Sequence, residues 1–296
     1  MRAWLIVICL AAAVPAAAQD RDRDGVSDRL EQALLDRFTP TLLLAHGECD
    51  GAPASFVAFR SDPFVRAKDS TLYGQAFSLT STDGRARIEL HYFHLWSRDC
   101  GRLGHDLDAE HVSAIVSASR LNAPPSLWIA EIWYAAAHEG SACDASSGAQ
   151  ARVLNAEANG PRIFISKGKH ASYLDRGQCK WGCGDECGEG RTVIPTAVIN
   201  IGERQAPLNG ALWIHSRRWP LAEKLSSDFD PSMRARLDAD GGDHVVPLMQ
   251  HLRAPQAPVL AGGAALNGLG MAVVQAEAAM TTATKAVARF VRRMRQ

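Results

Sequence analysis

The chain has 296 residues, with 32 Lys and Arg residues against 32 Asp and Glu residues, so its formal net charge is zero. This balance excludes a general basic field for nucleic acid, and it equally excludes a strongly acidic, self-solvating chain. The apolar fraction of 47% is ordinary for a globular protein and argues against wholesale disorder.

The N-terminus has the features of a secretory signal peptide. Met1-Arg2 supplies a positive charge, residues 4–14 are apolar, and residues 16–18 offer an A-x-A cleavage site. We therefore predict a signal peptide over residues 1–18 and a secreted or periplasmic protein. The alternative is a buried N-terminal core helix.

The cysteine count supports export. Of seven cysteines, Cys9 lies in the signal segment. The other six form an even set that predicts up to three disulfides, and the sequence does not choose among the pairings. At least one cysteine of the Gly-rich segment 179–187 then pairs outside it, with Cys143 a partner by position. The alternative of a zinc site lacks a fourth ligand and C-x2-C spacing. The six are Cys49, Cys100, Cys143, Cys179, Cys183 and Cys187.

The first residues after the signal segment have the spacing of a calcium-binding loop. Read as twelve residues, the loop has carboxylates at positions 1, 3, 5, 9 and 12, Gly25 at position 6, and a backbone carbonyl at position 7. Such a site would anchor the N-terminus, whereas the alternative is a solvated charge run with interleaved arginines. The predicted ligands are Asp20, Asp22, Asp24, Val26, Asp28 and Glu31.

The next elements predict a mainly β protein, a β-sandwich with peripheral helices and a C-terminal helix. A helix at residues 30–38 ends at Pro40, and short strands follow from residue 55 to about 201 with turns between them. The predicted strands are 87–96, 111–116, 127–134, 162–165 and 192–201. A short helix is expected after Pro231.

The C-terminal region differs in composition. Pro255 and Pro258 mark a linker, and residues 259–296 are rich in Ala and Gly with arginines near the end. An apolar heptad stripe predicts a basic amphipathic helix, which either packs on its own domain or lies against a membrane or a partner, self-association included. The predicted organisation is a signal peptide (1–18), a calcium-type loop (19–31), a β-sandwich domain with a divalent-cation cleft (32–254), and a linker with a helix (255–296).

A histidine–carboxylate cluster is the main candidate site. His105, Asp108 and Glu110 lie within six residues, and Asp108 and Glu110 point to one side of an extended segment. One imidazole and two carboxylates can hold a divalent cation and leave positions for water, and Asp99 lies close upstream. The alternative is a surface charge cluster. His138 and His170 follow two later strands and are candidate general bases if the protein is an enzyme.

These residues resemble a known family. Residues 104–110, read as G-H-x-x-D-x-E, resemble the G-H-R-H-D-W-E motif of the necrosis-inducing (necrosis- and ethylene-inducing-like) secreted proteins. Residues 108–112 resemble the D-W-E-h-V motif of the vacuolar protein sorting-associated protein 62 family, and residues 168–173 are similar to its G-S-H-A-S-Y segment. Residues 137–140 are similar to the S-A-H-G segment of the first family. The resemblance covers roughly residues 30–205.

The resemblance implies a β-sandwich with a divalent-cation cleft that engages lipid head groups. The motif's first His, its Asp and its Glu are metal ligands in the necrosis-inducing proteins, and they match His105, Asp108 and Glu110. Asp99 matches the family's upstream Asp only loosely in spacing. Leu107 and Ala109 replace the motif's second His and its Trp, which weakens the expectation of toxicity more than that of the fold.

Three functions follow as hypotheses. The first is an exported protein that binds lipid head groups or glycans through a divalent cation, Ca²⁺ or Mg²⁺. The second is a metal-dependent phosphoester or ester hydrolase that uses the same cleft, with His138 or His170 as base. The third is a structural envelope protein in which the cation sites only stabilise the fold. No G-x-S-x-G, H-E-x-x-H or P-loop motif is present, which disfavours those chemistries.

Overall fold

The computed structural model describes residues 19–101, 104–139, 141–203, 206–216, 227–229, 231–240 and 242–248. The predicted signal peptide, linker and C-terminal helix lie outside these residues. Within them, no helix has both the length and the apolar character that crossing a membrane requires.

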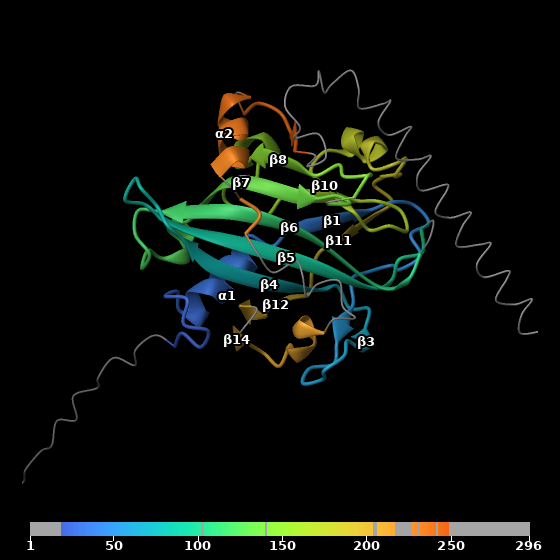
Figure 1. The fold of residues 1–296 in the computed structure, drawn as a ribbon, viewed down its shortest axis with the longest axis horizontal. Coiled ribbons are helices and arrows are strands. Elements are labelled where there is room, and N and C mark those ends of the chain that lie inside the picture. Colours follow the sequence, from blue (N-terminus) through green and yellow to red (C-terminus); the bar gives the residue numbers. More distant parts are fainter. Residues whose placement is uncertain are drawn as a thin grey trace, which may run out of the picture.

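Two β-sheets pack against each other and make the protein mainly β, as predicted (Figure 1). The larger sheet has the order β12-β4-β5-β6-β7-β8-β15, and the smaller has the order β10-β9-β1-β11. The larger sheet consists of β4 (Thr71–Leu79), β5 (Ala86–Arg98), β6 (Asp106–Ala118), β7 (Ile129–Ala136), β8 (Ser147–Gln150), β12 (Ala197–Asn200) and β15 (Val246–Pro247). The smaller consists of β1 (Thr41–Leu44), β9 (Arg162–Ile165), β10 (Ser172–Tyr173) and β11 (Arg191–Val193).

Short elements surround the sandwich. Two separate strand pairs are β2 (Ser55–Phe56) with β3 (Val65–Ala67), and β13 (Gly202–Glu203) with β14 (Ala206–Pro207). The α-helices are α1 (Asp28–Arg37) and α2 (Pro231–Ala239), both where helices were predicted. The 3-10 helices are η1 (Pro125–Leu127), η2 (Ala151–Leu154), η3 (Arg176–Trp181) and η4 (Leu212–His215).

Two strand predictions need correction. The predicted strand 192–201 is two strands, β11 and β12, which belong to different sheets. Pro195 lies between them, and proline has no N–H to donate to a sheet, so the chain leaves one sheet there and enters the other. The strands were also expected to be short, yet β5 and β6 have 13 residues each.

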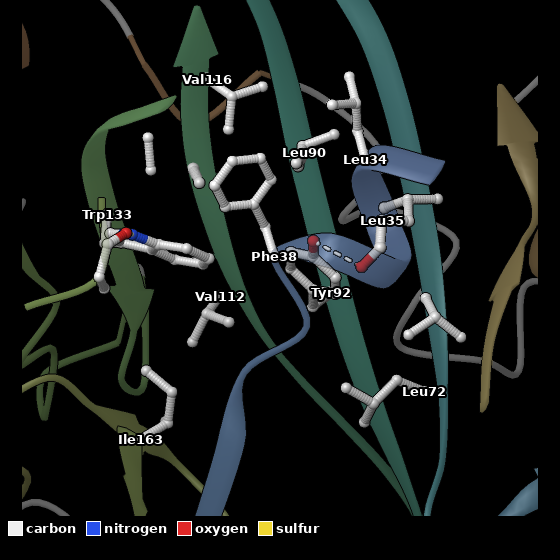
Figure 2. Close-up of a cluster of buried hydrophobic side chains, with 14 of the residues drawn as sticks. Leu34, Leu35, Phe38, Leu72, Leu90, Tyr92, Val112, Val116, Trp133 and Ile163 are labelled. Atoms are coloured by element: carbon white, nitrogen blue, oxygen red, sulfur yellow. Dashed lines mark hydrogen bonds between the residues drawn. The ribbon is translucent and has the colours of Figure 1, made fainter. Parts of the chain in front are cut away.

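The core lies between the sheets and includes one side of α1. Leu34, Leu35 and Phe38 are fully buried and pack against strand residues such as Leu90 and Trp133 (Figure 2). The Tyr92 hydroxyl donates a hydrogen bond of 3.0 Å to the Leu35 carbonyl, so this tyrosine satisfies its polar atom while its ring stays buried. The N-terminal helix is therefore an integral part of the sandwich.

A capping residue starts α1. Ser27 has an extended backbone, and its side chain accepts a hydrogen bond from the Leu30 N–H. Replacing a serine cap by alanine leaves that donor unsatisfied, so we expect Ser27→Ala to lower the free energy of unfolding by about 1 kcal/mol. Urea unfolding measures this loss, and Ser119→Ala, at an exposed position, is the control. Equal stabilities of the two variants would contradict the prediction.

Candidate functional site

The long β5–β6 hairpin places the predicted cluster at one end of the sandwich. In its antiparallel register Trp96 lies opposite Asp108, and His94 lies opposite Glu110. Side chains alternate along a strand, so Asp108 and Glu110 share the face that looks toward the smaller sheet, as predicted. His111 lies on the other face.

Three disulfides brace the loops at this end. Cys49–Cys100 joins the loop after β1 to the β5–β6 turn, and Cys143–Cys183 joins the loop after β7 to the segment after η3. Cys179–Cys187 closes that segment on itself. The pairing that the sequence left open is thus resolved, with Cys143 as the outside partner. Because all six sulfurs are bonded, the zinc alternative at residues 179–187 is excluded.

Asp108 contacts His170 at the centre of this end. Asp108 Oδ2 lies 2.9 Å from His170 Nδ1, and Glu48 Oε1 lies 3.3 Å from His170 Nε2. The His170 ring is fully buried and stacks on Trp96 with centroids 4.0 Å apart. Burial alone would lower the pKa of His170, but Asp108 and Glu48 outweigh it and raise the pKa to about 9. His170 is therefore an imidazolium at neutral pH, clamped between two carboxylates.

His105 and Asp99 lie in the turn of the same hairpin, where the His105 side chain is exposed and that of Asp99 is buried. His105 Nδ1 donates to the Leu107 carbonyl at 2.9 Å, so in the neutral ring Nε2 is the nitrogen with the lone pair. That Nε2 lies 3.8 Å from Asp99 Oδ2, which Lys169 Nζ approaches to 2.7 Å. His105 and Asp99 border an open surface pocket of about 420 Å³ together with Arg98, Cys100, Gly104 and Asp106.

His138 forms a third contact group. Its Nε2 lies 2.8 Å from Asp185 Oδ2, and the Tyr173 hydroxyl donates to the same oxygen at 2.8 Å. Burial would lower the pKa of His138, but the Asp185 carboxylate raises it above its ordinary value, and Glu110 adds to that effect from within electrostatic reach.

The predicted metal ligands thus belong to separate side-chain contacts and not to one site. Among the described residues, His105, Asp108, Glu110 and Asp99 do not form a set whose ligand atoms lie within 4.8 Å of one another. Asp108 meets His170, which was assigned a different role, and Asp99 meets Lys169. Lys169 and Asp185 were not predicted as site residues. Lys169 adjoins His170, and Asp185 lies two residues from both Cys183 and Cys187, so closeness in sequence to these residues was the only signal.

Four of the described non-glycine residues at this end have left-handed backbones, and one of them is Cys183, with a φ of 56°. Leu107, His138 and His170 have φ values of 62°, 54° and 56°, a region that non-glycine residues enter at a cost. Each of these residues either takes part in a contact described above or adjoins such a residue in the sequence. The fold therefore holds these side chains in position against a local backbone preference.

The N-terminal loop also has the geometry expected of a cation site. Ligand atoms of Asp20, Asp22 and Asp28 lie within 4.8 Å of one another, as do those of Asp22, Asp24 and Glu31. Gly25 has a φ of 91°, which is the sharp turn that the pattern requires at position 6. The Val26 side chain is buried in the core, so it fixes the loop to the sandwich.

Glu31 is the most deeply buried carboxylate of this loop. It is fully buried, and burial together with Asp22 raises its pKa to about 8. Asn200 of β12 donates to its Oε2 at 2.7 Å, whereas its buried Oε1 has no hydrogen-bond partner among the described residues. A buried carboxylate oxygen without a hydrogen-bond partner favours a bound cation.

Comparison with known proteins gives distant structural matches. No family model and no curated protein matches the chain. A structure of NLPPya in complex with glucosamine matches with 17% identity and a TM-score of 0.36, covering 67% of this chain and 82% of that one. The non-toxic HaNLP3 protein matches with 13% identity and a TM-score of 0.34, covering 67% and 91%.

A further match comes from the agent of a cocoa disease. Necrosis and Ethylene inducing Protein 2, from the causal agent of cocoa's Witches Broom disease, is 15% identical with a TM-score of 0.33 over 70% of this chain and 93% of that one. The chain is thus similar to structures of the same necrosis-inducing group that its residues 104–110 resemble. At these values the similarity carries no conclusion about ligand or activity, which depend on this chain's own residues.

Proposed function

We propose that the chain is an exported protein that binds polar head groups or glycans at the disulfide-braced end of its sandwich, with a divalent cation, Ca²⁺ or Mg²⁺, held by carboxylates there. One observation carries the proposal: disulfides join the loops that bear these carboxylates. Glu48 and Asp99 adjoin Cys49 and Cys100, and Asp185 lies two residues from Cys183. Loops fixed in this way lose little freedom when a ligand binds, which favours recognition.

The state of the two histidines favours binding over hydrolysis. A general base needs a neutral imidazole with an accessible lone pair. His170 is buried between Asp108 and Glu48, with its pKa raised to about 9. His138 is paired with Asp185, which raises its pKa as well. The burial and the raised pKa of His170 disfavour it as a water-activating base, and the contact with Asp185 occupies Nε2 of His138.

The donor atoms at this end suit a hard divalent cation, but the positively charged side chains of Lys169 and His170 already contact them. Asp108 and Glu48 share one imidazolium, so this contact retains a negative charge, and His105 Nε2 adds a lone pair next to Asp99. Carboxylate oxygens and an imidazole nitrogen are suitable ligands for divalent ions. A divalent ion at this end would compete with Lys169 and His170 for these oxygens.

Asp108→Asn tests the role of the carboxylate without changing its shape. We expect the variant to bind glucosamine or mannosamine, the sugars bound in two of the similar structures, about tenfold more weakly or worse, since such losses follow even from disturbing outer-shell partners of a metal. Isothermal titration with calcium or with EDTA measures this. Asp238→Asn, on the exposed side of α2, is the matched control.

The other outcomes separate the hypotheses. Binding only to vesicles that contain a sugar-bearing lipid, and not to the free sugars, assigns the site to lipid head groups. Binding that is indifferent to both EDTA and Asp108→Asn contradicts the proposal. Turnover of phosphoesters or esters that Asp108→Asn abolishes would favour the hydrolase. A loss of melting temperature alone would favour a structural envelope protein.

A further inference from the structure

A second histidine–carboxylate cluster lies on the face of the larger sheet opposite to the candidate site. Glu89 and His91 come from β5, His111 comes from β6, and Asp228 comes from the segment 227–229 ahead of α2. The side chains of Glu89 and His91 are 0% exposed, that of His111 is 1% exposed, and that of Asp228 is 7% exposed. Nothing in the function proposed above uses these residues.

Glu89 determines where the proton of the His91 ring lies. Its Oε2 accepts from the Ser227 hydroxyl at 2.6 Å, and its Oε1 accepts from the Asp228 backbone N–H at 2.8 Å. The same Oε1 lies 2.8 Å from His91 Nε2. A carboxylate that receives these donors acts as an acceptor toward the ring as well, so Nε2 carries the proton. In the neutral ring, Nδ1 is then a bare lone pair.

That lone pair points at Asp228. His91 Nδ1 has no hydrogen-bond partner among the described residues, and it lies 3.5 Å from Asp228 Oδ2. His111 Nε2 lies 3.1 Å from the same oxygen. One ligand atom each from His91, His111 and Asp228 therefore falls within 4.8 Å of the others. The Ser113 hydroxyl donates to this oxygen and His111 Nε2 lies within hydrogen-bond distance of it, whereas a lone pair on His91 Nδ1 repels the buried carboxylate unless a cation lies between them.

The geometry favours a metal ion over protons as that cation. The 3.1 Å between His111 and Asp228 is an ordinary hydrogen-bond length, but the 3.5 Å between His91 and Asp228 is longer than an N–H···O hydrogen bond. Ligand atoms of a tetrahedral zinc site with bonds of about 2.0–2.2 Å are about 3.3–3.6 Å apart, which matches the longer distance. Two imidazolium rings would also repel each other, because His91 and His111 stack with centroids 5.9 Å apart. One divalent ion balances the charges of Glu89 and Asp228 without placing two cations face to face.

We propose that His91, His111 and Asp228 form a zinc-type site that fastens the segment 227–229 to the outer face of the larger sheet. Two imidazoles and a carboxylate are the donor set that Zn²⁺ and similar first-row ions prefer. Glu89, on the far nitrogen of His91, is the carboxylate that commonly orients a zinc-bound histidine. Phe77 and Phe93 both stack against the His91 ring and cover part of it.

Metal titration of the full chain with its disulfides formed tests the proposal. After EDTA treatment, we expect the protein to take up one equivalent of Zn²⁺ that His91→Gln and His111→Gln abolish. Glu89→Gln is expected to weaken zinc affinity by about 10–100-fold, since it removes only an orienting partner. His244→Gln, at an exposed histidine, and His105→Gln, in the candidate site, are the controls and should retain the zinc.

Measurements on the wild-type chain keep the test valid if a variant fails to fold. Co²⁺ in place of Zn²⁺ should give the visible absorption of a tetrahedral nitrogen–oxygen site, and zinc should slow proteolysis within residues 227–248. No zinc uptake by the folded wild-type chain overturns the proposal. Zinc uptake that His105→Gln abolishes, and that folded His91→Gln retains, also overturns it by placing the ion in the candidate site. The proposed binding function stands or fails separately, on the sugar titration.

Discussion

His170→Ala is expected to lower the free energy of unfolding by about 3–5 kcal/mol, the loss that follows when one partner of a buried ion pair is removed. The reason is that Asp108 and Glu48 both contact this imidazole, and the substitution leaves two carboxylates beside each other without it. The stack on Trp96 is lost as well. For a domain of this size such a change corresponds to a fall in melting temperature of roughly 10 °C or more.

The pH dependence gives this prediction a second readout. The pKa of His170 is raised in the folded protein to about 9, from an ordinary value of 6.5. Its stabilising contribution is thus complete below pH 6.5 and disappears as the pH rises through 9. Calorimetry of the wild type and His170→Ala should show a gap that narrows across this interval, with His244→Ala as the control. A gap that stays constant with pH would contradict the charged clamp.

Removal of calcium is expected to destabilise the protein by about 3 kcal/mol when the ion had been present at roughly 100 times its dissociation constant. The loop from Asp20 to Glu31 ties the N-terminus to β12 through Asn200, and Glu31 is fully buried. Calorimetry with calcium and with EDTA should therefore differ by roughly 5–10 °C in melting temperature. Equal melting temperatures would contradict a calcium site here.

The metal-free protein should also respond to pH through Glu31. Because the folded pKa of Glu31 is raised to about 8 from 4.5, the folded state holds this proton more tightly than the unfolded state. Stability in EDTA is therefore expected to fall as the pH rises from about 4.5 to 8, and calcium should suppress the fall. Glu31→Gln should remove both the slope and the response to calcium. Glu157→Gln, at an exposed position, should change neither.

Local patterns were sufficient to predict much of the fold. The apolar spacing of Leu34, Leu35 and Phe38 predicted α1, and the aromatic and branched run at residues 87–96 predicted the centre of β5. The two-sheet architecture also followed from strand and turn signals. The division of residues 192–201 into two strands could not be predicted in this way. Pro195 can either end a strand or only bend it, and which of the two happens depends on which sheet has a free edge there.

The candidate site was predicted less well because its contacts are long-range. Asp108 and Glu110 were correctly expected on one face of a strand, since that depends only on alternation. The partner of Asp108 is His170, 62 residues away, and a sequence pattern carries no distance between separate loops. The ion pair between Lys169 and Asp99 was not predicted for the same reason. In contrast, the calcium-type loop is contiguous, so its spacing was enough to predict its carboxylate groups.

An anomalous-scattering map from crystals soaked in Mn²⁺ tests the central claim most directly, because manganese accepts the same oxygen and imidazole ligands as Ca²⁺ and Mg²⁺. We predict a peak at the disulfide-braced end that Asp108 contacts, besides the peak in the loop from Asp20 to Glu31. Lys169 or His170 should then have moved off its carboxylate. A peak in the N-terminal loop with none near Asp108 would contradict the proposed cation-dependent binding site.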